Sequence, residues 1–146
     1  MKKYRGFTLL EMILSISIIL IILSVSNINF NVRDRLEAKY QLRELSTNIK
    51  FIKNYAQINN CRTNIVINDD GYEMYYGNHK KSIKFNKLIK VLDSNTRDIR
   101  FTSTGKPSNL NSINSAGTIN FIIDDKPIRL TIQPVTGKVN LYEKEK

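Results

Sequence analysis

A dense apolar block near the N-terminus constrains this chain more than any other feature. The block runs over 19 residues, Phe7 to Val25, behind the basic residues Lys2, Lys3 and Arg5. A helix of this length is about long enough to cross the roughly 30 Å hydrocarbon core of a bilayer. No Ala-x-Ala signal-peptidase site follows the block. Since positive flanks tend to stay cytoplasmic, we expect a single-pass membrane helix with a cytoplasmic N-terminus.

Length and charge set the limits for the rest of the chain. Its 146 residues leave room for a membrane segment and one small folded body. Lys and Arg outnumber Asp and Glu by 23 to 13, a formal net charge of +10. This positive charge favours contact with anionic lipid, polysaccharide or nucleic acid, but charge alone does not indicate which of these is the partner. The single cysteine, Cys61, excludes an intrachain disulfide, so the body must be held together by packing.

One carboxylate, Glu11, interrupts the apolar block. An acidic side chain at the centre of a membrane helix costs about 2.5–3.5 kcal/mol and usually has a partner. One reading is a shallow glutamate that reaches headgroup water. The other rests on the hexapeptide Gly6-Phe7-Thr8-Leu9-Leu10-Glu11, which resembles the prepilin processing site of type IV pilins and of the pseudopilins of secretion and DNA-uptake machines.

This resemblance implies a role for each matching position. Residues 1–6 would be a leader peptide that prepilin peptidase removes by cutting between Gly6 and Phe7, and the same enzyme would methylate the new amino group of Phe7. Glu11 would attract the terminal amine of a neighbouring subunit, an attraction that a low dielectric strengthens. The implied partners are the peptidase, other pilin or pseudopilin subunits and, indirectly, an assembly platform and ATPase.

The pattern after the block predicts a second helical segment. Residues 7–26 form the expected membrane part, and residues 27–58 an amphipathic continuation. The segment Ser26–Asn31 lowers helix propensity but contains no Pro or Gly, so we predict one long helix from Phe7 to about Ile58; an anchor followed by a separate helix is the alternative. Apolar residues recur every three or four positions on one face: Ala38, Leu42, Leu45, Ile49, Ile52 and Ala56.

Residues 59–146 read as an antiparallel β domain. A hairpin is predicted around Asp69-Asp70-Gly71, and residues 82–92 are ambiguous, so we predict a loop with a short strand there. The predicted strands are Thr63–Asn68, Tyr72–Tyr76, Asp98–Thr102, Gly117–Ile123, Ile128–Ile132 and Lys138–Tyr142. The fold class is therefore α+β: a long N-terminal helix, membrane-spanning in its first half, packed on a C-terminal antiparallel sheet. This is the pilin fold.

The C-terminal half adds a second resemblance. The segments Ile99–Gly105, Gly117–Phe121 and Ile128–Val139 look like those of H-type minor pseudopilins of type II secretion, fimbrial T-type minor pilins and competence pseudopilins. Two differences from major pilins also favour a minor pilin or pseudopilin subunit. Position 28 is Ile rather than a kinking Pro, and no cysteine pair closes a C-terminal loop.

The groups needed for catalysis are scarce, so we expect no enzyme, no cofactor and no metal site. His79, the only histidine, reads as a solvated loop residue, and Cys61 as a core residue at the helix end. The pairs Asp69-Asp70 and Asp124-Asp125 fall in predicted turns, where Asp is favoured. A basic run with aromatic neighbours is a possible anion or DNA contact; it comprises Lys80, Lys81, Lys84 and Lys87.

Three hypotheses for function follow. The first is a minor pilin or pseudopilin, a structural subunit of a type IV pilus-like, type II secretion or competence filament. The second is a competence pseudopilin that presents its basic domain to DNA. The third is a plain signal-anchored extracellular protein. In the first two, the chain begins as a cell-membrane protein with an extracytoplasmic body and then joins a filament at the cell surface.

Overall fold

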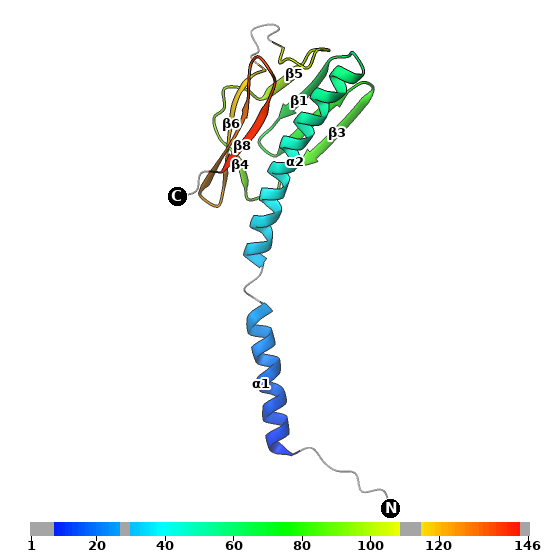
Figure 1. Ribbon diagram of the computed structural model, residues 1–146. Coiled ribbons are helices and arrows are strands. Elements are labelled where there is room, and N and C mark those ends of the chain that lie inside the picture. The colour runs from blue at the N-terminus through cyan, green and yellow to red at the C-terminus, as the bar shows by residue number, and fades with distance from the viewer. Residues whose placement is uncertain (1–7, 27–29, 109–114, 144–146) are drawn as a thin grey trace, which may run out of the picture. The chain divides into compact units, whose positions relative to one another are not determined.

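The computed structural model describes residues 8–26, 30–108 and 115–143, and it is an α+β chain. Within these described residues, two helices are followed by eight strands. Figure 1 shows how these elements are arranged. The helices are α1 (Leu9–Ser26) and α2 (Phe30–Ile58). The strands are β1 (Thr63–Ile67), β2 (Gly71–Tyr76), β3 (His79–Lys84), β4 (Ile89–Val91), β5 (Asp98–Phe101), β6 (Gly117–Ile123), β7 (Lys126–Ile132) and β8 (Val139–Glu143).

The chain divides into two compact units, Met1–Arg33 and Asp34–Lys146. In the first, the apolar side chains of α1 are more than half exposed all around the helix, from Leu9 to Leu23. Within the ranges described, no helix combines the length and apolar character needed to cross a membrane. The prediction of one uninterrupted helix from Phe7 to Ile58 depends on residues 27–29, which lie outside the described residues.

The predicted apolar stripe of α2 forms one side of the core. All six of its residues have no exposed surface, namely Ala38, Leu42, Leu45, Ile49, Ile52 and Ala56. The helix ends where Asn60 takes a left-handed conformation, with φ of 48°, and the Cys61 N–H donates to the Ala56 carbonyl at 3.1 Å. This arrangement is a Schellman-type ending, in which Asn stands at the position that usually takes Gly.

Sheet A has the strand order β3-β2-β1-β5 and is antiparallel throughout. The β1–β2 hairpin around Asp69-Asp70 is confirmed, and it pairs Ile67 with Tyr72. Buried residues alternate along the strands, so Ile65, Met74 and Ile99 face the core. The Thr63 hydroxyl donates to the Ile52 carbonyl of α2 at 3.0 Å and ties β1 to that helix.

Sheet B has the order β4-β6-β7-β8 and contains the predicted C-terminal meander. The β6–β7 turn has two residues, Asp124 and Asp125, with φ of 49° and 62°. Positive φ at both positions is the geometry that matches a tight turn to the twist of its strands. The inward residues Ile119, Phe121 and Leu130 complete the core. Figure 1 shows the later part of α2 running along the strands.

The structure differs from the sequence predictions in two respects. The strands form two four-stranded sheets, not one, because β5 returns to pair with β1 while β4 joins β6. Residues 79–84 form the full edge strand β3, whereas the predicted short strand lay within residues 82–92 and His79 was predicted as a loop residue. The side chains of β3 are almost all exposed, so it carries no alternating apolar signal.

Candidate functional site

The predicted processing segment begins outside the described residues, since Gly6 and Phe7 are not among them. The structure describes the next residues, Thr8 to Glu11, as the start of α1. The Glu11 N–H lies 3.3 Å from the Thr8 hydroxyl, and the Glu11 carboxylate accepts from the Thr8 N–H at 3.4 Å. This reciprocal pair is a capping box, which satisfies two of the free N–H groups at a helix start. Glu11 therefore has a local partner, Thr8, which is the second residue after the predicted cleavage point.

The serines of α1 are also satisfied within the helix. The hydroxyls of Ser15, Ser17 and Ser24 each donate to the carbonyl four residues earlier, at 2.8 Å. A hydroxyl bonded in this way needs no water. The helix thus presents an apolar surface interrupted at its start by the Glu11 carboxylate.

The four lysines of the predicted anion site do not form one patch. In an antiparallel pair, directly opposed residues share a face. Lys80 lies opposite Tyr75 on the outer face of sheet A, whereas Lys81 lies opposite the buried Met74 and so points to the other face. Lys84 is on the outer face, opposite Gly71. Lys87 lies in the loop after β3, with its Nζ 3.8 Å from an Asp34 carboxylate oxygen.

The positive charge of Lys80 is offset by the carboxylate of Glu73. Its Nζ lies 3.1 Å from Glu73 and 5.4 Å from the centre of the Tyr75 ring. The hydrogen bond from the Tyr75 hydroxyl, followed by that from Lys80, lowers the pKa of Glu73, and the hydrogen bond to Glu73 raises the pKa of Lys80. A lysine already held by a carboxylate contributes little to phosphate binding, so the DNA alternative gains no support from this strand.

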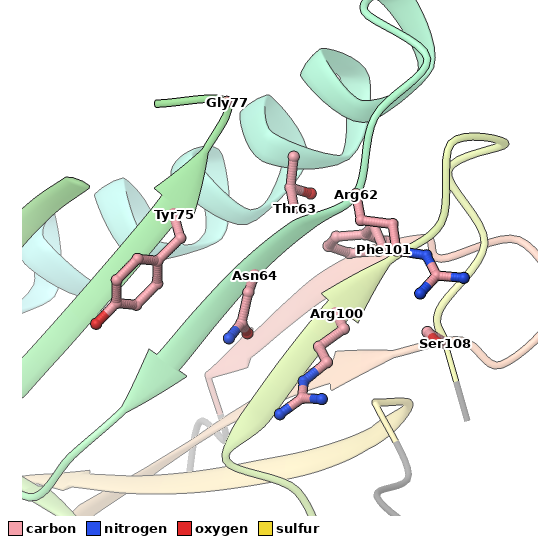
Figure 2. A pocket seen from close by; sticks show the side chains of 8 residues that line it. All are labelled: Arg62, Thr63, Asn64, Tyr75, Gly77, Arg100, Phe101 and Ser108. Atoms are coloured by element: carbon pink, nitrogen blue, oxygen red, sulfur yellow. The ribbon is translucent and has the colours of Figure 1, made fainter. Parts of the chain in front are cut away.

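Next to this strand, the outer face of sheet A holds a row of polar side chains that the sequence analysis missed. Figure 2 shows Tyr75, Asn64 and Arg100 on neighbouring strands, beside a hollow of about 300 Å³ that Arg62 and Ser108 also line. The Arg100 guanidinium donates three hydrogen bonds of 2.5–3.1 Å to the Asp98 carboxylate. These hydrogen bonds raise the pKa of Arg100. The Asn64 Oδ1 atom is buried without a described partner, so a solute in the hollow cannot reach it unless neighbouring atoms move.

The other residues considered in the sequence analysis lie in ordinary positions within the fold. His79 is exposed, as predicted, but begins β3 and lies against the Tyr76 ring at 5.4 Å. Cys61 is a free, half-buried thiol. Asp69 pairs with Arg97 at 2.7 Å and Asp124 with Arg35 at 2.5 Å. Across the described ranges, no three metal-binding side chains come together.

The comparisons with known proteins concern the N-terminus. Residues 1–26 match the family described as "Prokaryotic N-terminal methylation motif". The prepilin-type motif predicted from the hexapeptide is therefore confirmed, and it indicates a type IV pilin-like or pseudopilin chain processed by prepilin peptidase. No curated protein and no solved structure matches the chain. The resemblance of the C-terminal half to H-type, T-type and competence subunits stays a prediction.

Proposed function

We propose that this chain is a minor pilin or pseudopilin, a structural subunit of a type IV pilus-like, type II secretion or competence filament. The observation that carries the proposal is the methylation motif over residues 1–26. Prepilin peptidase cuts between Gly6 and Phe7 and methylates Phe7. Proteins with this motif are structural, and the scarcity of reactive groups is consistent with a subunit that performs no chemistry of its own.

Before assembly, the subunit is held in the cell membrane with its N-terminus cytoplasmic and its body outside. The argument rests on the sequence of the apolar block and its basic flank. It is supported by α1, whose exposed side chains are apolar on every side and whose serines bond internally. Such a helix is stable only in apolar surroundings, whether lipid or neighbouring helices.

The outer surface of α2 supports assembly with other subunits. Within residues 34–58 of this helix, four large apolar side chains lie exposed: Leu36 (50%), Tyr40 (65%), Phe51 (45%) and Ile58 (82%). Their spacings of 4, 11 and 7 residues keep them on one side of the helix. Leu36, Tyr40 and Ile58 each stand two residues, or about 200°, from a core residue, so this assembly stripe lies opposite the buried stripe.

The charges beside the assembly stripe favour another copy of the chain, or a similar subunit, as its occupant. Successive helix residues are about 100° apart, which places Arg43 and Lys50 along one side of the stripe and Glu37 and Glu44 along the other. Two parallel helices side by side bring the acidic flank of one against the basic flank of the next. A contact between unlike surfaces that does not close produces a helical filament.

Processing is tested by co-expressing the chain with a prepilin peptidase and measuring the mass of the product. We expect the loss of residues 1–6 and the gain of one methyl group on Phe7. The matched control, Gly6→Leu, places a bulky side chain at the cleavage position and should keep the full mass. An unchanged mass for the natural sequence contradicts the pilin proposal and favours a plain signal-anchored protein.

Assembly is tested by cysteine crosslinking in cells that express the peptidase, platform and ATPase of a filament system. With Cys61→Ser as background, Tyr40→Cys should give crosslinked dimers, the largest product that one thiol per subunit allows. Val135→Cys is the control, because it is 74% exposed but lies in the β7–β8 turn, away from the stripe. Equal crosslinking at both positions would show random collision and remove the support for the stripe.

A further inference from the structure

The outward face of sheet B carries a hollow that neither processing nor assembly uses. Its volume is about 570 Å³, within the range of small-molecule sites. Neutral polar side chains, one guanidinium, one phenol ring, the Glu143 carboxylate and the apolar residues Pro127 and Ile128 line it. The main lining residues are Thr118, Asn120, Arg129, Thr131 and Tyr142.

Strand register places these side chains in two rows across the sheet. Asn120 on β6 lies opposite Arg129 on β7, which lies opposite Tyr142 on β8. In the neighbouring row, Thr118 lies opposite Thr131, with the two hydroxyl oxygens 3.4 Å apart. Directly opposed side chains in a sheet have Cβ atoms about 5 Å apart, so each row is a compact set of groups facing the hollow.

The charge of the hollow is unusual for this strongly basic chain. Arg129 is exposed and has no ion pair with any described residue. The Glu143 carboxylate also lines the hollow, but it is held by Lys39 at 2.6 Å and by Arg43 at 3.4 Å. The Arg129 guanidinium therefore has no carboxylate partner among the described residues, while Glu143 beside it is paired with two cations. Arg129 can hold one ligand carboxylate with paired donors.

The ring of Tyr142 adds an apolar surface beside these polar groups. The residue is 55% exposed at the sheet edge. The Asn120 amide nitrogen donates to the Asp93 carbonyl at 3.2 Å, which fixes that side chain next to Arg129. A phenol ring has both an apolar face and a polar tip, so it suits a ligand that is partly apolar and partly hydroxylated.

We propose that this face of sheet B binds an acidic oligosaccharide, with a sugar carboxylate on Arg129, hydroxyls on Asn120, Thr118 and Thr131, and a sugar ring against Tyr142. A nucleic acid fits less well, because binding its phosphate chain requires several cations and the hollow offers one. A purely apolar ligand would leave these polar groups unpaired. The inference does not depend on filament assembly.

Titration calorimetry on the full chain in detergent micelles tests the proposal. The probes are tetragalacturonate, its neutral methyl ester and a single-stranded oligonucleotide of equal charge. We expect tetragalacturonate to bind, and the ester to bind about tenfold more weakly because the charge-assisted hydrogen bonds to Arg129 are lost. Arg129→Gln should weaken tetragalacturonate binding by about tenfold while leaving binding of the ester unchanged.

Further variants separate this site from general charge attraction. Tyr142→Ala should weaken both sugars several-fold, whereas Tyr142→Phe keeps the ring and should retain most binding. Arg62→Gln is the matched control, because Arg62 is an exposed arginine just before β1 and has no ion pair among the described residues. Absence of tetragalacturonate binding overturns the proposal. So does equal weakening by Arg62→Gln and Arg129→Gln, or tighter binding of the oligonucleotide that is sensitive to Arg129.

Discussion

The side-chain amide of Asn48 on α2 donates a hydrogen bond of 2.7 Å to the phenol oxygen of Tyr72 on β2. Tyr72 is 1% exposed, and its ring also lies 5.7 Å from that of Phe85. The contact joins the helix to the middle of sheet A. A buried phenol with one polar partner favours its neutral form, and burial raises the pKa of Tyr72 to about 12.

The first prediction concerns stability at alkaline pH. Because the pKa is about 10 unfolded and about 12 folded, the contribution of Tyr72 is complete below pH 10 and is lost between pH 10 and 12. The free energy of unfolding should fall there by about 1.4 kcal/mol per pH unit. Tyr72→Phe should cost about 1 kcal/mol at pH 8 and remove this part of the alkaline decline. Urea unfolding at several pH values measures both.

Tyr40→Phe is the control for this series, since Tyr40 is 65% exposed. It should leave the free energy of unfolding and the alkaline decline as they are in the natural chain. If Tyr72→Phe and Tyr40→Phe give the same pH profile, the phenol of Tyr72 is not protected by burial.

The second prediction concerns the link between α2 and the last strand. The hydrogen bond from Lys39, aided by Arg43, lowers the pKa of Glu143 from its usual 4.5. The contribution of Glu143 is therefore present above pH 4.5 and is lost as the pH falls through the lower folded value. Glu143→Gln should cost about 0.5–1 kcal/mol at pH 7, because the pair is partly exposed, and the cost should vanish at low pH.

Urea unfolding at pH 7 and pH 3 measures this effect. Glu37→Gln, which removes an exposed carboxylate without an ion pair to any described residue, should change neither value. A cost for Glu143→Gln that stays the same at both pH values would mean that packing, not charge, is responsible.

The third prediction concerns Gly71, which the sequence placed in a turn. The structure puts it at the start of β2, opposite Lys84. A Cβ atom added there would lie 2.3 Å from the backbone carbonyl oxygen of Ile83, which cannot move without disturbing β3. Gly71→Ala should therefore cost about 1–3 kcal/mol. Ser82→Ala, at an exposed position of the β2–β3 hairpin, is the control and should cost little. If both substitutions cost equally little, the backbone of β3 can shift to make room for the added methyl group, and the prediction is wrong.

Gly71 illustrates how far the sequence could be read. Local patterns were sufficient where the signal lies within one element, as in the buried stripe of α2 and the β1–β2 hairpin. They failed for His79–Lys84, because an exposed edge strand needs no apolar alternation and lysines there discourage edge-to-edge pairing. The division into two sheets depends on β5 pairing with β1 across more than thirty residues, which no local pattern specifies.

The candidate sites also differ in whether local sequence patterns could predict them. The processing motif is contiguous, so it could be predicted from the hexapeptide. The set Asn120, Arg129 and Tyr142 could not, because only the strand register brings these residues into one row. Register also separated Lys80 from Lys81, which are adjacent in the sequence but point to opposite faces.

The last prediction separates two tasks of Glu11. In the structure its carboxylate caps α1 through Thr8, whereas the proposed filament role requires its negative charge. Glutamine serves in a capping box as glutamate does but carries no charge. Glu11→Gln should therefore keep α1 capped, yet assemble as poorly as Glu11→Ala, when filaments are quantified after co-expression with the peptidase and assembly proteins. Both variants should still lose residues 1–6, which shows that each reaches the membrane. If Glu11→Gln restores filaments while Glu11→Ala does not, the cap is what assembly needs, and the charge attraction to a neighbouring amine is not.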